Sequence, residues 1–227
     1  MRFFDFEQIM TTARMSRYLN ACSGDSKKAM TLYRKNLKLS YELFTIISCF
    51  EVAIRNIIDK HYIATLGNDW LQNSASTGGI FDTRNCRLTK QNINEAIHKL
   101  RPAYSHNKLV AELGFGFWRY MFAPNQFVAA HTTLLAVLPA KPRSSATIQY
   151  NHTHIFNKLA IINDLRNRIA HHEPVCFLPG MAIKDTNYAR LHYNHILELF
   201  RWMDIDNAGL MYGLDHIINV CNQIDSL

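Results

Sequence analysis

The chain has 227 residues, 48% of them hydrophobic, which excludes global disorder and leaves room for one large domain or two small ones. Lysine and arginine outnumber aspartate and glutamate by 25 to 18, and the net charge of +7 favours a polyanionic partner. The five cysteines are scattered and form no C-x-x-C pair, which argues against a disulfide framework or a zinc finger and fits a reducing compartment.

The N-terminus carries Asp5 and Glu7 where a signal peptide needs an apolar core. The most apolar stretch, residues 127–140, contains His131 and is shorter than the roughly twenty residues that span a membrane. We therefore expect a soluble, cytoplasmic protein that does not enter a membrane.

The first third of the chain has the apolar spacing of α-helices, and one helix is predicted over residues 3–20. Residues 27–66 contain no proline or glycine, so they form either one long helix or two shorter ones. The polar, glycine-bearing residues 72–87 predict a loop, whose Arg84 and Arg87 either contact phosphates or are simply solvated.

Further helices are predicted over residues 89–101, 108–122, 124–138, 147–172, 186–203 and 210–223. The aromatic segment L-G-F-G-F-W-R-Y-M-F in the second of these is interpreted as core packing rather than as a platform for stacking bases. Its two glycines predict the close approach of a neighbouring helix. Because no hairpin signal, sustained alternation or linker occurs, the sequence predicts an all-α fold of about seven to nine helices, without a significant sheet, as a single domain over residues 1–227.

Residues 163–174, N-D-L-R-N-R-I-A-H-H-E-P, end an otherwise apolar helix with a cluster of arginine, asparagine and histidine. Asn167 and His171 share a helix face, whereas Arg166 lies about 140° from His171 around the axis. One regular helix therefore does not bring the Arg166 and His171 side chains together. Two copies that meet across a two-fold axis would do so, and so would a last turn that loosens ahead of Pro174.

These side chains suit the cleavage of RNA without a metal. The Arg166 guanidinium would stabilise charge on the phosphate, and His171 would act as the base that helps the ribose 2′-OH attack phosphorus. The expected products carry a 2′,3′-cyclic phosphate and a 5′-OH. Asn167 would orient His171 or bind phosphate, and Arg168 and His172 would hold the RNA backbone. From physics alone, a helix C-cap that places cations at the negative end of the helix dipole explains the cluster equally well.

A second polar pair lies in the long apolar run. Glu51 and Arg55 stand four residues apart, so they can form an ion pair on one helix face. Alternatively, Arg55 and Asn56 point into a polar site.

Other chemistries find little support in the sequence. A metal site from His171, His172 and Glu173 is disfavoured because adjacent histidines on a helix point apart. No G-x-S-x-G, G-x-x-x-x-G-K-[ST] or G-x-G-x-x-G motif occurs, which disfavours a serine nucleophile, NTP hydrolysis and dinucleotide binding. We expect no cofactor.

Three segments resemble one family. L-R-N-R-I-A-H-H-E-P-V, residues 165–175, resembles the R-x(4–6)-H signature of HEPN ribonucleases, in the form of their Abi-like, abortive-infection branch. F-E-V-A-I-R-N-I-I, residues 50–58, resembles the E-x-x-x-R helix of that branch, and residues 109–122 resemble its central L-x-F-G-x-W segment. Together the three segments span most of the chain.

The resemblance implies a HEPN-like helical bundle with additional helices, and a homodimer that acts as a metal-independent endoribonuclease in bacterial anti-phage defence. Some relatives are toxins held in check by an RNA or protein antitoxin. By position, Arg166 and His171 match the catalytic pair, Asn167 matches the polar residue after the arginine, and Glu51 and Arg55 match the companion helix. Because some HEPN proteins only bind RNA or scaffold assemblies, a non-catalytic RNA-binding or interaction module is the alternative.

Overall fold

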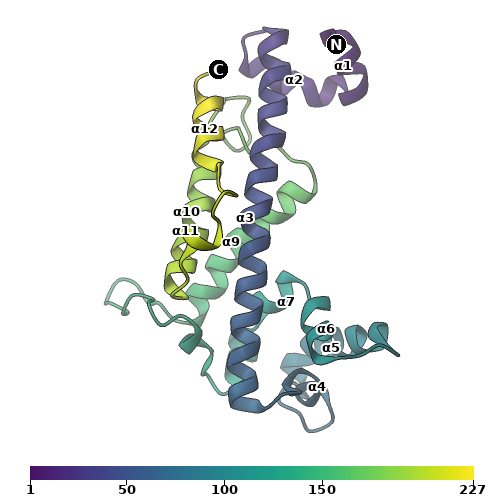
Figure 1. Cartoon of the computed structure of the whole chain (residues 1–227), viewed down its shortest axis with the longest axis vertical. Coiled ribbons are helices and arrows are strands. Elements are labelled where there is room, and N and C mark those ends of the chain that lie inside the picture. Colours follow the sequence, from purple (N-terminus) through teal and green to yellow (C-terminus); the bar gives the residue numbers. More distant parts are fainter. The chain divides into compact units, whose positions relative to one another are not determined.

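A computed structural model describes residues 1–227, and Figure 1 shows that the chain is built from helices. It has twelve α-helices and two short 3-10 helices, and its only β-type contact is an isolated bridge between Phe177 and Lys184. The all-α prediction is therefore confirmed, although the helices are more numerous and shorter than predicted. No helix combines the length and the apolar character needed to cross a lipid bilayer.

Contacts divide the chain into two compact units. Unit 1 comprises Met1–Ser48, Asp164–Leu197 and Asn207–Leu227, and unit 2 comprises Cys49–Asn163 and Glu198–Asp206. The assignment of residues 1–227 to a single domain stays a prediction.

The longest element is α3, which runs from Ser26 to Leu66 as one unbroken helix. The choice between one helix and two is thus settled in favour of one. The Asp25 carboxylate accepts hydrogen bonds from the backbone N–H groups of Lys27 and Lys28, both at 3.0 Å, and so caps the first turn. Gly67 ends the helix with φ +97°, a left-handed conformation that glycine adopts without a steric penalty.

Unit 1 contains α1 (Phe3–Met10), α2 (Thr12–Ala21), the first part of α3, the end of α9 (His152–Ala170), most of α10 (Asn187–Trp202), α11 (Asn207–Leu210) and α12 (Ile217–Asp225). A row of buried rings joins its elements: Phe6 to Tyr33 at 5.4 Å, Tyr33 to Tyr18 at 5.1 Å, and Tyr18 to Phe177 at 4.9 Å. Such edge-to-face contacts fix α1, α2, α3 and the segment after α9 against one another.

The predicted helix over residues 3–20 is wrong in one respect, because it breaks at Thr11. Thr11 has φ +71°, which is incompatible with a continuous helix, and its Oγ1 accepts a hydrogen bond from the Arg14 N–H at 3.3 Å. Thr11 therefore ends α1 and caps α2. A threonine in the middle of an amphipathic pattern gave no local sign of this break.

Unit 2 contains the second part of α3, α4 (Trp70–Ala75), η1 (Arg84–Cys86), α5 (Arg87–Leu100), α6 (His106–Glu112), α7 (Phe115–Tyr120), α8 (Pro124–Ala129), η2 (Leu134–Val137) and most of α9. Its core includes Trp70, whose ring lies 4.6 Å from Tyr62 and 6.5 Å from Trp118. Asp59 accepts hydrogen bonds from Trp70 Nε1 at 2.7 Å and from His106 Nε2 at 2.8 Å, which ties α3 to α4 and α6.

Two further predicted helices are shorter in the structure. The helix over 108–122 breaks at Leu113 and Gly114, where the buried Trp118 indole donates a hydrogen bond to the Leu113 carbonyl at 2.9 Å. The helix over 124–138 ends at Ala129. The predicted loop over 72–87 is also partly wrong, because α4 and η1 occupy its two ends.

The aromatic segment around α7 is confirmed as core, since Phe115, Phe117, Trp118 and Phe122 are all buried. The close approach expected at its glycines is wrong. A Cβ atom added at Gly114 or Gly116 would meet no other atom within 4 Å, so both positions face open space.

In the last third, α9 begins five residues later and ends two residues earlier than predicted, and α10 agrees closely with its prediction. The helix expected over 210–223 is replaced by α11 and α12, which are separated by a turn that contains Gly213 at φ +73°.

Candidate functional site

The candidate motif lies at the C-terminal end of α9 in unit 1. His172 has φ +56°, its N–H donates to the Ile169 carbonyl, and the Glu173 N–H donates to the Arg168 carbonyl, both at 2.9 Å. This pair of bonds is a Schellman motif with a histidine in the left-handed position that glycine usually takes. Backbone hydrogen bonds therefore cap α9 at its C-terminal end. This is the position at which the capping interpretation of the sequence places the end of the helix.

The hydrogen-bond ladder of α9 is regular as far as the candidate base. The His171 N–H still donates to the Asn167 carbonyl at 2.9 Å, so the last turn loosens only after His171. A separation of about 140° between Arg166 and His171 therefore holds within one chain. Arg166 and Asn167 are half-buried on the helix, whereas His171 and His172 are exposed beyond its end.

The exposed histidines line a recess of about 390 Å³ between the end of α9 and α2, which we call the α2 recess. The turn supplies His171, His172, Glu173 and Pro174, and α2 with its cap supplies Thr11, Ala13, Arg14, Arg17 and Tyr18. All of these residues belong to unit 1. Arg166 is not among them, so the structure brings His171 together with His172 but not with Arg166 in this recess.

Arg14 fixes the turn to α2. Its Nη1 donates a hydrogen bond to the His172 carbonyl, which lies just beyond the end of α9, at 3.0 Å. The rest of the Arg14 side chain is exposed, so its guanidinium has donors to spare for an anion. Sequence reasoning missed this residue.

Arg17, one turn further along α2, is committed to the protein. Its Nε donates to the Met181 carbonyl at 3.0 Å, its Nη2 donates to the Leu178 carbonyl at 3.2 Å, and its guanidinium lies 4.6 Å from the centre of the Phe177 ring. The i, i+3 spacing of Arg14 and Arg17 on one amphipathic helix was the sequence signal that could have drawn attention to both.

Arg168 faces away from bulk solvent. Its guanidinium lies 4.8 Å from the centre of the Tyr188 ring, its Nε lies 3.5 Å from Glu173 Oε2, and only 19% of its side chain is exposed. The Tyr188 ring in turn lies 4.1 Å from the ring of buried His192. Arg168, proposed from sequence as an RNA contact, therefore has structural partners in α10 and in the turn.

Burial shifts the pKa of two side chains near the end of α9, His192 and Tyr18. Burial lowers the pKa of His192 below its usual value, and the nearby Arg168 charge acts in the same direction, although the hydrogen bond to the Tyr188 carbonyl and the charge of Asp164 oppose it. Burial also raises the pKa of the Tyr18 phenol in the α2 recess. At neutral pH, His192 is thus neutral and Tyr18 is a protonated hydroxyl.

The companion residues Glu51 and Arg55 lie one turn apart on α3, in the part that belongs to unit 2, and both are half-buried. The Nε of Arg55 is buried and has no hydrogen-bond partner.

The α2 recess combines the permanent charge of Arg14 and Arg17 with two titratable imidazoles and one carboxylate. Guanidinium groups bind phosphate oxygens, and imidazole is the side chain that most often serves as a general acid or base. The recess can therefore hold a phosphate-sized anion next to a proton-transfer group.

Comparison with known proteins gives one result. A family model described as Abi-like protein matches residues 3–176, from the start of α1 to the segment that follows the α2 recess turn. No curated protein and no solved structure matches the chain.

Proposed function

The chain belongs to the Abi-like protein family, and we propose that it is an abortive-infection defence protein that cleaves RNA at the end of α9. The family suggests a part in abortive infection. The observation that supports the finer proposal is the exposed His171 beside Arg14 in the α2 recess, on the same helix as the half-buried Arg166.

In the proposed reaction, His171 accepts the proton of a ribose 2′-OH as the 2′ oxygen bonds to the adjacent phosphorus. The bond from phosphorus to the 5′ oxygen breaks, and that oxygen takes up a proton to become a 5′-OH. The other fragment keeps a 2′,3′-cyclic phosphate. Arg166 stabilises the charge that develops on the non-bridging oxygens, and no metal takes part.

The proposed site is composite. Because Arg166 and His171 point in directions about 140° apart on one helix, a second copy of the chain is needed to bring a guanidinium and an imidazole to the same phosphate. We therefore include a homodimer in the proposal. Asn167 orients the histidine or binds phosphate, and His172 and Arg14 hold the RNA backbone at the recess.

A purified-protein assay tests this function. Wild-type protein is incubated with labelled RNA in EDTA, next to His171→Ala, Arg166→Ala and the matched control His98→Ala, which removes an exposed histidine from unit 2. We expect cleavage by wild type and the control, with 2′,3′-cyclic phosphate ends, and a loss of about a hundredfold or more in the first two variants. Undiminished cleavage by His171→Ala would reject the assignment.

In cells, the proposal predicts that expression of the wild-type chain slows growth and that His171→Ala relieves this effect. An RNA or protein antitoxin would act by covering the site. Growth that is equally slow with both chains would speak against toxicity through RNA cleavage.

The Schellman motif and the enclosed Arg168 favour a second candidate, a non-catalytic RNA-binding module, because they give structural roles to several residues of the motif. That module would bind RNA with a steep salt dependence and release no fragments. The same assay in EDTA, read for both binding and products, separates the two functions.

A further inference from the structure

Unit 2 contains a second hollow that the reaction above does not use. It has a volume of about 650 Å³ and lies among η1, the first turns of α5, α7 and the start of α8. This volume is in the range of pockets that hold small organic ligands. We call it the arginine–tyrosine hollow after Arg84, Arg87 and Tyr120, which line it.

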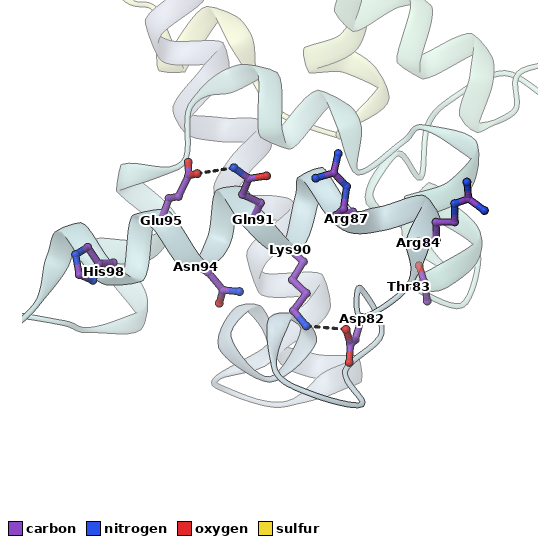
Figure 2. A pocket seen from close by; sticks show the side chains of 9 residues that line it. All are labelled: Asp82, Thr83, Arg84, Arg87, Lys90, Gln91, Asn94, Glu95 and His98. Carbon is purple, nitrogen blue, oxygen red and sulfur yellow. Dashed lines mark hydrogen bonds and ion pairs between the residues drawn. The ribbon is translucent and has the colours of Figure 1, made fainter.

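Two arginines of the hollow have no ion-pair partner in the chain. Arg84 and Arg87 are both exposed and form no hydrogen bond or ion pair with the chain. They also line a neighbouring pocket of about 770 Å³, whose acidic residues are Asp82 and Glu95, whereas the lining of the arginine–tyrosine hollow contains no acid. Lys90, one turn further along α5, is by contrast paired with Asp82 at 2.6 Å. Figure 2, which draws the side chains of the neighbouring pocket, shows the guanidinium groups of Arg84 and Arg87 pointing away from the Lys90–Asp82 pair. Each of the two guanidinium groups has free N–H donors that suit a phosphate.

The hollow also offers a flat apolar surface. Tyr120 is 50% exposed, and its ring stands edge-on against Phe156 with 5.4 Å between centres, so the ring is held in place. Leu88, which is 64% exposed, lies in the same lining. An exposed but immobilised aromatic ring is the usual surface on which an unpaired base stacks.

Amide groups complete the lining. Gln126 is buried, and its Nε2 donates to Thr89 Oγ1 at 2.8 Å, so its amide is held in a fixed position. Asn92 and Asn125 are exposed in the same lining. Amides present both donors and acceptors, which can pair with the edge of a base. A site for phosphate alone would need neither the amides nor the ring.

We propose that the arginine–tyrosine hollow binds a nucleoside phosphate as one unit of single-stranded RNA, with its phosphate on Arg84 and Arg87 and its base against Tyr120. The assignment to RNA rests on the proposed function. The hollow belongs to unit 2 and His171 to unit 1, so binding and cleavage are altered by separate substitutions.

Gly116 allows a substitution that fills the hollow without disturbing the core. It lines the hollow, lies within α7, and a Cβ there would meet no atom within 4 Å. Gly116→Leu therefore adds a side chain in open space at a helical position, where leucine is favoured over glycine. The change leaves the net charge unaltered, so any effect on binding reflects occlusion.

The test measures binding of a fluorescent single-stranded RNA oligonucleotide to full-length chains that carry His171→Ala, so that the probe stays intact. We expect about tenfold weaker binding with Gly116→Leu, with Tyr120→Ala and with the double variant Arg84→Ala/Arg87→Ala. The matched control Lys60→Ala/Arg143→Ala removes two exposed charges of unit 2 outside the hollow and should bind within about twofold of its parent.

A second arm uses the mononucleotide AMP, read by calorimetry. The proposal is supported if the parent chain binds the oligonucleotide and Gly116→Leu weakens that binding. Unchanged binding of RNA by a folded Gly116→Leu chain overturns it, and so does an equal loss in the Lys60/Arg143 control. Binding of AMP without binding of the oligonucleotide assigns the hollow to a free nucleotide and overturns the RNA source.

The two proposals can fail independently. Wild-type chains that cut no RNA, together with a loss of binding in Gly116→Leu, reject the nuclease and support the hollow. Gly116→Leu chains with an intact His171 that cut RNA with unchanged KM reject the hollow and leave the nuclease standing.

Discussion

At the scale of single residues, the end of α9 shows a conflict between stability and chemistry. His172 occupies a left-handed backbone position that favours glycine, yet its side chain is exposed in the α2 recess. Strained non-glycine residues often cluster at functional sites, and Thr11, the other residue with positive φ in this recess, has the same character. We interpret the strain at His172 as the cost of placing an imidazole at the site.

This interpretation predicts the effect of His172→Gly. Glycine removes the steric penalty at positive φ, so the free energy of unfolding should rise by about 1 kcal/mol, while RNA cleavage or binding should fall. Urea denaturation and the RNA assay measure the two effects. The neighbouring His171→Gly is the control, since it weakens a regular helix end and should lower stability. Equal destabilisation by both changes would contradict the account.

His192 predicts how stability depends on pH. Because its pKa in the folded chain is lowered below the usual value, the unfolded chain binds a proton more readily on acidification. The stability that the neutral imidazole contributes is present above the usual histidine pKa and is lost as the pH falls through it. His192→Asn keeps a donor for the Tyr188 carbonyl but cannot titrate, so its unfolding free energy should depend less on pH between about pH 7.5 and 5.5. A curve as steep as that of the wild type would refute this role.

At the scale of elements, a single carboxylate oxygen joins three helices of unit 2. Asp59 Oδ1 on α3 accepts from Trp70 of α4 and from His106 of α6, and all three side chains are largely enclosed. The short helices α4 and α6 have little hydrogen bonding of their own to hold their position. This arrangement explains how a run of six- and seven-residue helices keeps a defined packing.

Asp59→Ala should therefore be strongly destabilising. It leaves the buried Trp70 indole N–H without an acceptor and removes the partner of His106, and we expect a loss of about 2–3 kcal/mol in unfolding free energy. Asp59→Asn, which retains Oδ1, should lose clearly less. Urea midpoints that are the same for both variants would show that the hydrogen bonds do not hold these helices.

At the scale of the whole molecule, each unit has a hollow that is lined by arginines, the α2 recess in unit 1 and the arginine–tyrosine hollow in unit 2. The α2 recess carries titratable groups, whereas the arginine–tyrosine hollow carries a ring and amides. The first has the side chains for proton transfer and the second those for holding a nucleotide. Neither hollow contains Arg166, so the proposed cleavage depends on a second copy of the chain.

Cleavage should consequently depend on protein concentration. If a composite site forms only in a dimer, the activity per chain falls on dilution and follows the fraction of dimer measured by mass photometry. Two copies joined by a flexible linker should keep their activity on dilution, because the linker maintains a high effective concentration. Activity per chain that is constant through the dimer–monomer transition would exclude the composite site.

The sequence by itself determined the helical class and the polar end of α9, because helical periodicity and capping depend on residues within a few positions of one another. Whether residues 27–66 form one helix or two was decided only by the tertiary structure. Only the tertiary structure decided where the helices break, as at Thr11 and Gly114, and which distant groups meet. Arg14 reaches the His172 carbonyl across 158 positions of sequence, and Tyr120 shares a hollow with Arg84 and Arg87. These contacts depend on how buried side chains pack between helices, so the spacing of residues along the sequence does not predict them.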